Sequence, residues 1–151
     1  MEVFRISKQA FSHQLTSSGV ANRWNNDNEF VIYTASSRAL ATLEFLVHLN
    51  LVKPSFTCKT LVIDIPETSE FIDVIRKEDL PDDWREIDSY PALQTIGSEW
   101  YRNNHSPVLK VPSAIIPQEF NYIINTRHPQ FNEIDLADTE DYFWDIRLFT
   151  T

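Results

Sequence analysis

The chain has 151 residues, of which 42% are hydrophobic, 13% aromatic and 23% charged, and its formal net charge is −9. This length and composition predict one folded domain over residues 1–151, with a core of its own. The acidic excess argues against direct nucleic-acid binding, which depends on Lys and Arg neutralising phosphates, and two glycines exclude a glycine-rich phosphate loop.

The sequence offers no signal for a membrane or for an oxidising compartment. Cys58 is the single cysteine, so an intrachain disulfide is excluded. Residues 1–20 are polar and mixed, unlike a signal peptide. No apolar run approaches the roughly 18 residues that span a bilayer. We therefore expect a cytoplasmic protein that does not contact a membrane.

The N-terminal part predicts a strand followed by a long loop. Residues 2–7 alternate between apolar and polar side chains, which is typical of a strand. Arg5 lies on this strand, where it is either a surface charge, which the pattern slightly favours, or a residue that points into a site. Residues 8–29 lack periodicity and predict a loop. A loop of this length in a compact domain is often functional, and it contains Arg23.

A strand and a helix are predicted next. Residues 30–35 are apolar, β-branched and aromatic, as in a buried strand. Residues 38–49 are rich in Ala and Leu and contain no Gly or Pro, which predicts a helix. Either Ser36 or Ser37 can cap its N-terminus.

Glu44 is the unusual residue of this helix. Apolar side chains lie all round the helix, so much of it should be buried, and a buried ionised carboxylate is costly unless it has a partner. Leu40, Glu44 and His48 share one face by their i, i+4 spacing. That face looks into a polar pocket with a cation or ligand nearby, or Glu44 lies on a solvated stripe. The pattern leaves both open.

The second half of the chain predicts more strands than helices. The expected elements are a strand at 58–65, a strand rather than a short helix at 70–76, a charged turn at 77–90, a helix at 91–104, strands at 107–111 and 120–125, a turn at His128-Pro129 leading into a helical turn, and a closing strand at 142–149. Without a strict βαβ rhythm, this order predicts an α+β fold with a mostly antiparallel sheet. The acids of 77–90 are interpreted as a solvated turn, and no metal site is predicted.

An ordered set of motifs resembles the RES domain, a family named for Arg, Glu and Ser. Arg-Trp-Asn begins at Arg23, Tyr33 follows ten residues later, Glu44 eleven residues after that, and Ser113 lies in VPSA. Further matches are VFRIS at 3–7, SRALATLE at 37–44, PDDWR at 81–85 and NYIIN at 121–125. The resemblance covers nearly the whole chain in order.

The resemblance implies a fold similar to ADP-ribosyltransferase toxins, with split, mostly antiparallel β-sheets and a few helices around an NAD cleft. It also implies a toxin of a bacterial toxin–antitoxin system that cleaves the nicotinamide–ribose bond of NAD, by hydrolysis or phosphorolysis. NAD is then the substrate, and no separate cofactor is implied. The implied partners are an antitoxin with a Xre-type helix-turn-helix domain, which occludes the cleft, and a second copy of the chain in a homodimer.

The candidate site residues have separate expected roles. Glu44 would hold the ribose and stabilise the positive charge that develops on it. Arg23 would bind the pyrophosphate, because a guanidinium bonds phosphate in a bidentate fork. The other expected roles are a second phosphate contact or a surface position for Arg38, stacking or a ribose contact for Tyr33 unless it is a core tyrosine, loop shaping for Trp24 and Asn25, and a substrate contact or a local backbone bond for Ser113.

Two other functions use the same residues or none of them. An ADP-ribosyltransferase that modifies a protein would differ from the NAD-degrading enzyme only in its acceptor. A non-catalytic binding module would need no active site, and the joint presence of Arg23, Tyr33, Glu44 and Ser113 argues against it. The sequence leaves the roles of Arg5, His48, Asn121 and Asn125 open.

Overall fold

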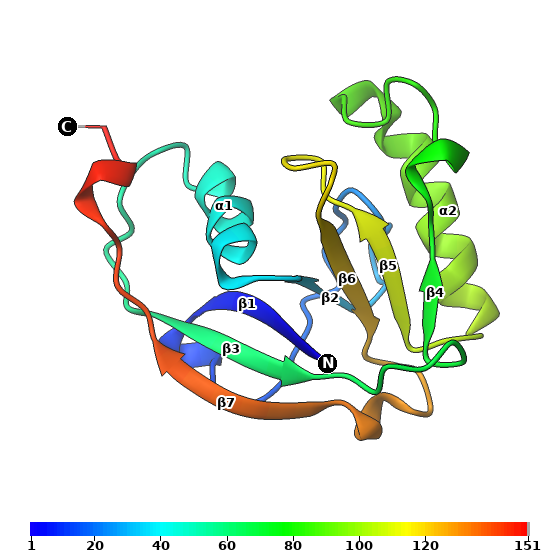
Figure 1. Cartoon of the computed structure of the whole chain (residues 1–151), viewed down its shortest axis with the longest axis horizontal. Helices are drawn as coiled ribbons and strands as arrows, with labels where there is room; N and C mark the ends of the chain where they lie inside the picture. Colours follow the sequence, from blue (N-terminus) through cyan, green and yellow to red (C-terminus); the bar gives the residue numbers. More distant parts are fainter. Residues whose placement is uncertain (151) are drawn as a thin grey trace.

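The computed structural model describes residues 1–150, which form a curved β-sheet with two α-helices against it (Figure 1). In this part of the chain the elements are β1 (Glu2–Lys8), β2 (Val31–Ala35), α1 (Arg38–His48), β3 (Cys58–Asp64), β4 (Ile72–Val74), α2 (Tyr90–Asn103), β5 (Val108–Pro112), β6 (Phe120–Asn125) and β7 (Asp135–Asp141). Most bounds lie within one or two residues of the predicted ones. None of the helices in residues 1–150 is long and apolar enough to cross a membrane.

The sheet has the strand order β4-β5-β6-β2-β1-β3-β7. All neighbouring strands pair in the antiparallel sense except β4 and β5, which are parallel. The predicted α+β fold with a mostly antiparallel sheet is therefore confirmed. The short strand β4 confirms that the segment 70–76 contains a strand rather than a helix, although the strand covers only Ile72–Val74.

The sheet is split between β1 and β2. These strands share one register pair, Phe4 with Ala35. By contrast, β1 pairs with β3 along its whole length from Glu2 to Lys8, and β2 pairs with β6 from Val31 to Ala35. Figure 1 shows the consequence: β1, β3 and β7 turn away from β2, β6, β5 and β4. The sheet thus consists of two halves that meet at a single point.

Helix α1 packs beside this split. Its N-cap is Ser37, whose side chain accepts a hydrogen bond from the Leu40 amide, so one of the two predicted capping serines is confirmed. Leu40 and Ala41 pack against Phe4 in a core cluster that also includes Cys58. The exposed residues of the helix lie at its two ends: Arg38 and Ala39 in the first turn, and Val47 and His48 in the last. Because α1 lies against both β1 and β2, it brings its middle turn to the place where the two halves separate.

Helix α2 covers the other half of the sheet, alongside β4 and β5 (Figure 1). It contains Pro91 in its first turn, where a missing amide costs nothing. Leu93 and Trp100 are buried against Leu109 and Ile123, as the predicted apolar stripe requires. A third cluster, including Val3, Ile32 and Ile63, fills the space between the two halves on the other face.

The prediction of a closing strand at 142–149 is wrong. The last strand is β7, Asp135–Asp141, an edge strand that pairs with β3. Residues 142–149 contain a short 3-10 helix, Ile146–Leu148, instead of a strand. The alternating aromatic residues of this segment pack against α1: the Trp144 ring lies 5.7 Å from the Phe45 ring and 4.7 Å from the Tyr142 ring. Tyr142 and Trp144 are partly buried and Phe143 between them is 83% exposed, so the pattern reflects one-sided contact with a helix, not a place in the sheet.

Both glycines are fixed by close contacts of the 8–29 loop. Gly19 has a φ of +75°, and a Cβ there would lie 2.7 Å from the Phe30 ring. Gly97 is on α2, and a Cβ there would lie 1.7 Å from the carbonyl oxygen of Trp24. The loop therefore rests directly on the backbone of α2 at the residue after Arg23.

Candidate active site

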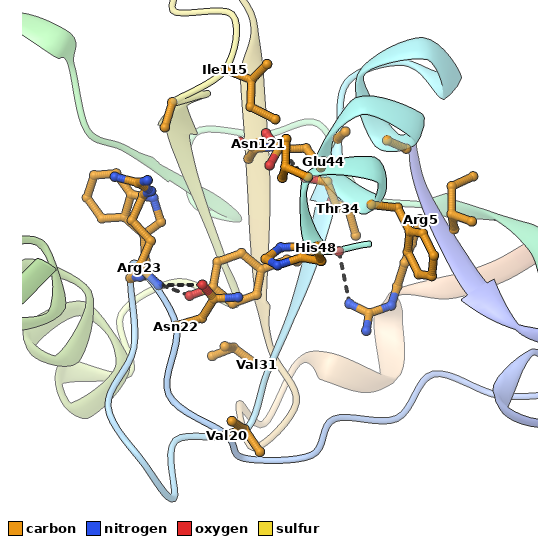
Figure 2. A pocket seen from close by; sticks show the side chains of 18 of the residues that line it. Arg5, Val20, Asn22, Arg23, Val31, Thr34, Glu44, His48, Ile115 and Asn121 are labelled. Carbon is orange, nitrogen blue, oxygen red and sulfur yellow. Dashed lines mark hydrogen bonds between the residues drawn. The ribbon is translucent and has the colours of Figure 1, made fainter. Parts of the chain in front are cut away.

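A cavity of about 460 Å³ opens at the split in the sheet. Its walls come from β1, β2, β6, α1, the 17–24 loop, the first residue of α2 and the segment after β5. A volume of this size is typical of small-molecule sites. Figure 2 shows the side chains that line it, with Arg23 on one side and Glu44 and Arg5 on the other. The charged lining residues are Arg5, Arg23 and Glu44, and His48 also lines the cavity.

Glu44 faces this cavity rather than bulk solvent. Its carboxylate oxygen Oε1 accepts a hydrogen bond of 3.0 Å from the Ser113 hydroxyl. Ser113 is fully buried, and its Oγ also accepts hydrogen bonds from the amides of Ile115 and Ile116, both at 3.1 Å. Of the two readings left open for Glu44, the polar pocket is therefore the observed one. Ser113 shows the local backbone bonding that was one of its two expected roles, and it also holds Glu44, which was not expected. Its contact with a substrate stays a prediction.

Arg23 is held by backbone oxygens and an aromatic ring. Its Nη1 donates to the carbonyls of Trp84 and Arg85, at 3.2 and 3.1 Å, and its guanidinium lies 4.6 Å from the centre of the Tyr90 ring. Among residues 1–150 no carboxylate forms an ion pair with Arg23. Its positive charge at the cavity wall is thus not neutralised by a neighbour.

Tyr33 ties the Arg23 loop to the sheet. Its hydroxyl accepts from the Trp24 amide at 3.0 Å and donates to Oδ1 of Asn25 at 2.6 Å. Burial raises the pKa of this hydroxyl well above its usual value. The ring lines the cavity, while the hydroxyl is engaged with the loop. Trp24 is 3% exposed and lines the cavity. It packs in the core cluster between α2 and the sheet, here called the α2-side core, which includes Leu93, Trp100, Leu109 and Ile123. Both contacts are in keeping with a loop-shaping residue.

Arg5 lies at the cavity, contrary to the slight preference of its sequence pattern for a surface position. Its Nη1 donates to the Tyr33 carbonyl at 3.1 Å (Figure 2), and burial lowers the pKa of its guanidinium. The alternation of residues 2–7 predicted the strand that carries Arg5 but not the partner of its side chain, because this partner depends on where β1 and β2 separate.

Arg38 is not brought together with the other candidates. It is exposed, forms a two-point ion pair with Glu140 of β7 at 2.8 and 2.5 Å, and lies over the Phe4 ring. Arg38 is absent from the cavity wall, whereas His48 and Asn121 are part of it. The Asn121 amide donates to the Thr34 carbonyl at 3.2 Å, and Asn125 is buried and bonds the Arg127 amide, so their places are now defined.

Two buried residues support the Arg23 loop: Glu29, which sequence reasoning missed, and Asn25, which it expected to shape the loop. Glu29 is buried, and its Oε1 accepts from the Asn26 amide at 2.6 Å and from the Ser98 hydroxyl at 2.7 Å. Asn25, 1% exposed, donates from Nδ2 to the carbonyls of Val20, Asn26 and Glu29. A charged residue next to an apolar strand was the available signal for Glu29. Nothing in the spacing pointed to its partner on α2.

The cavity combines a positioned carboxylate with two arginines from other elements. Three or more His, Cys, Asp or Glu side chains in an arrangement that could hold a metal ion do not occur within residues 1–150. Arginines bind phosphate oxygens in a forked geometry, and a carboxylate accepts hydrogen bonds from sugar hydroxyls. The arrangement therefore suits a ligand that carries both phosphate and ribose.

The fold and the cavity define an α+β protein whose sheet opens around a site lined by arginine and glutamate side chains. Comparison with known proteins identifies the family to which it belongs. The RES domain matches residues 2–145. A protein of Photorhabdus laumondii named "Toxin Res" is 35% identical over 98% of this chain and 97% of its own length. A Pseudomonas putida protein with the same name is 34% identical over 99% of this chain and 100% of its own length. The "Prs ADP-ribosylating toxin" of a Sphingobium species is 35% identical over 83% of this chain and 79% of its own length.

This chain belongs to the RES domain family. The resemblance drawn from Arg23, Glu44 and Ser113 is therefore confirmed at the level of the family. The structure places Glu44 and Ser113 in direct contact and Arg23 across the same cavity, although the three lie far apart along the chain.

Proposed function

We propose that this protein is a toxin of a bacterial toxin–antitoxin system that depletes NAD by cleaving its nicotinamide–ribose bond. Membership of the RES domain family and full-length similarity to proteins named "Toxin Res" support this proposal. The observation that carries it is the Glu44 carboxylate, held on the cavity wall by buried Ser113 and facing a space whose other side is lined by Arg23.

The reaction requires little proton transfer from the protein. In hydrolysis the bond between ribose C1′ and the nicotinamide nitrogen breaks, and its electron pair neutralises the pyridinium. A water oxygen bonds to C1′ and loses one proton. In phosphorolysis a phosphate oxygen takes the place of water. Since nicotinamide leaves as a neutral molecule, no general acid is needed, and stabilisation of the oxocarbenium-like transition state is the main task.

We assign this task to Glu44. A carboxylate hydrogen-bonded to the ribose hydroxyls stabilises positive charge developing on the sugar, and it can also orient the attacking water. The Ser113 hydroxyl donates to Oε1, which leaves Oε2 as the atom directed to substrate. Ser113 then acts chiefly by fixing the carboxylate.

The phosphates are assigned to Arg23 and Arg5. Both line the cavity, and both are anchored through Nη1 on backbone carbonyls, Arg5 on one and Arg23 on two. Arg38 would first have to leave Glu140, so we place the second phosphate contact on Arg5. The Tyr33 ring offers a stacking surface for nicotinamide, while its hydroxyl holds the Arg23 loop.

A second candidate is ADP-ribosylation of a protein. It is favoured by one observation, the similarity to a relative named "Prs ADP-ribosylating toxin". The same bond to nicotinamide would break, and a nucleophilic side chain of the target protein would take the place of water at C1′. The residues that hold NAD would be unchanged.

The proposal also includes partners. A toxin that consumes NAD must be kept inactive in its own cell, and we expect a Xre-type antitoxin that covers the cavity, a homodimeric toxin and a cytoplasmic location. Co-expression of the toxin with the neighbouring gene product, followed by size-exclusion chromatography with light scattering, tests both the complex and the dimer.

The direct experiment is to incubate the purified protein with NAD labelled in both nicotinamide and adenine. Release of nicotinamide is followed with and without phosphate, with Glu44→Gln as the matched variant. Release that the variant lacks supports NAD cleavage, and a requirement for phosphate identifies phosphorolysis. Adenine label on an added protein supports transfer. Wild-type protein that does neither, although folded and free of antitoxin, contradicts both enzymes and leaves the non-catalytic binding module.

A further inference from the structure

The two halves of the candidate site are joined by one surface arginine. Arg23 is anchored on the carbonyls of Trp84 and Arg85, which belong to the turn between β4 and α2. From the same turn, the Nε atom of Arg85 donates to the carbonyl oxygen of Ala114 at 2.7 Å. Ala114 follows Ser113, the residue that holds Glu44.

These contacts form a continuous chain across the cavity wall. Glu44 accepts from Ser113, Ser113 continues into Ala114, Ala114 accepts from Arg85, and the Arg85 carbonyl accepts from Arg23. The two ends of the chain are the residues assigned to ribose and phosphate. The middle of the chain is an exposed side chain that does not line the cavity.

Other contacts of the 84–85 turn keep it folded on α2, but they do not form a hydrogen bond with the segment after Ser113. Trp84 is 5% exposed and packs with Leu93 and Val111 in the α2-side core. The Ser89 hydroxyl donates to the Asp83 carbonyl within the turn. Without Arg85 the turn should therefore remain folded on α2. Its hydrogen bond to Ala114 would be lost, and only the apolar packing of Ala114 against the Trp84 cluster would still join it to the Ser113–Ile115 segment.

We propose that Arg85 is a positioning residue that sets the distance between the Arg23 anchor and the Ser113–Glu44 pair. The inference rests on the proposed NAD reaction for its kinetic consequences only. Its structural content, that the 84–85 turn and the 113–116 segment move as one unit because of the Arg85–Ala114 bond, is independent of the substrate.

Arg85→Ala is the first test. It should raise KM for NAD about tenfold, the effect of losing one hydrogen bond from a charged donor, because Arg23 no longer lies at a fixed distance from Glu44. The effect on kcat should be smaller. Arg85→Lys, which can still reach the carbonyl with one donor, should recover part of the loss.

The matched control is Arg76→Ala. Arg76 is also exposed, lies on the same connection and pairs locally with Asp79. Its loss changes the net charge equally, so it measures the general effect of making an acidic protein more acidic. A KM for Arg85→Ala equal to that for Arg76→Ala would overturn the proposal.

Two further measurements separate positioning from simple loss of stability. In an Arg23→Ala background, Arg85→Ala should leave KM nearly unchanged, because the residue through which it acts is missing. An equal rise in both backgrounds overturns the proposal. Hydrogen exchange should become faster at the amides of Ile115 and Ile116 and stay unchanged at Val62 in β3.

The exchange measurement also separates the two proposals. If wild-type protein releases no nicotinamide, the proposed function fails, yet faster exchange at Ile115 and Ile116 in Arg85→Ala still supports the link. Unchanged exchange at these amides overturns it, whatever the activity.

Discussion

Nη1 of Arg5 donates a hydrogen bond to the carbonyl oxygen of Tyr33 at the point where β1 and β2 stop pairing. Phe4 and Ala35 form the single register pair of these two strands. Arg5 follows Phe4 on β1, and its side chain bonds the Tyr33 carbonyl. If β1 and β2 paired along their whole length, a backbone amide of β1 would bond this carbonyl instead. The split that opens the cavity thus leaves a backbone acceptor, and a cavity arginine satisfies it.

This relationship predicts that Arg5→Lys weakens NAD binding. A lysine ammonium has no planar fork, so it cannot bond the Tyr33 carbonyl and present a second pair of donors to a phosphate. We expect KM for NAD to rise about tenfold, while the melting temperature stays close to that of wild type. Steady-state nicotinamide release and calorimetric NAD titration measure the two quantities.

Arg38→Lys is the comparison for Arg5→Lys. Arg38 is exposed and engaged with Glu140, so its conversion to lysine should leave KM within about twofold, as for a surface ion pair. A rise in KM with Arg38→Lys and none with Arg5→Lys would return the second phosphate contact to Arg38.

Ser113→Ala is expected to impair both stability and turnover. The change removes the donor to Glu44 and leaves the amides of Ile115 and Ile116 without their acceptor. Loss of a buried hydroxyl that serves several partners costs about 1–3 kcal/mol of unfolding free energy, which urea denaturation measures. Nicotinamide release should fall at least about tenfold, mainly through kcat, because the carboxylate is no longer fixed.

A second buried serine serves as control. Ser12 is 2% exposed, and its hydroxyl donates to the Gln9 carbonyl away from the cavity. Ser12→Ala should lower stability without changing kcat. Equal losses of kcat in the two variants would mean that Ser113 affects activity only through folding.

Much of the fold could be predicted because its elements carry strong local signals. The helix Arg38–His48 has a capping serine, a run of helix-forming residues and no breaker, and β3 is a run of buried apolar residues. The edge strand β7 has four acidic residues in its seven and pairs only with β3, so neither face shows the alternation of a half-buried strand. The aromatic alternation of residues 142–149 indicates that one side of this segment packs against another element. It does not show whether that element is a strand or, as observed, helix α1.

The site could be predicted as a set of residues but not as a geometry. Glu44 was recognised as a carboxylate out of place on an apolar helix, and the family motif supplied Arg23 and Ser113. Arg5 could not be assigned, since its environment depends on the separation of two strands. The Glu29–Ser98 contact joins residues 69 positions apart, and no local pattern encodes such a contact.

Tyr33→Phe tests whether the tyrosine hydroxyl serves the loop. The ring is retained, but the Trp24 amide and Oδ1 of Asn25 lose their shared partner. We expect the unfolding free energy to fall by about 1–2 kcal/mol at neutral pH and KM for NAD to rise, since the loop carries Arg23. A fall in kcat with unchanged KM and stability would instead place the hydroxyl at the reacting atoms.

The same variant has a defined pH dependence. Burial raises the pKa of Tyr33 in the folded protein above its ordinary value of 10. Above that pH the unfolded chain releases the proton while the folded protein keeps it, so deprotonation favours unfolding. Wild-type stability should therefore fall more steeply than that of Tyr33→Phe as the pH rises beyond about 10. Parallel curves would mean that the hydroxyl ionises freely in the folded state.

Gly97→Ala is expected to destabilise the protein although it replaces glycine inside a helix. In an exposed helix this change adds about 0.5–1 kcal/mol of stability. At position 97 the new Cβ would lie 1.7 Å from the Trp24 carbonyl oxygen, so the Arg23 loop must move away from α2. Overpacking of this kind costs about 1–3 kcal/mol, which exceeds the helical gain. KM for NAD should rise with the displacement of Arg23.

Thr95→Ala provides the reference for Gly97→Ala on the same helix. Thr95 is exposed and bonds only the Pro91 carbonyl one turn earlier, so its replacement should change stability by no more than about 0.5 kcal/mol and leave KM unaltered. Thermal unfolding measures the change in stability of the two variants, and nicotinamide release measures the change in their KM. If Gly97→Ala instead stabilises the protein and leaves KM unchanged, the loop can move off α2 at no cost. The position of Arg23 would then be set by its carbonyl contacts with Trp84 and Arg85 rather than by the contact of Trp24 with the helix.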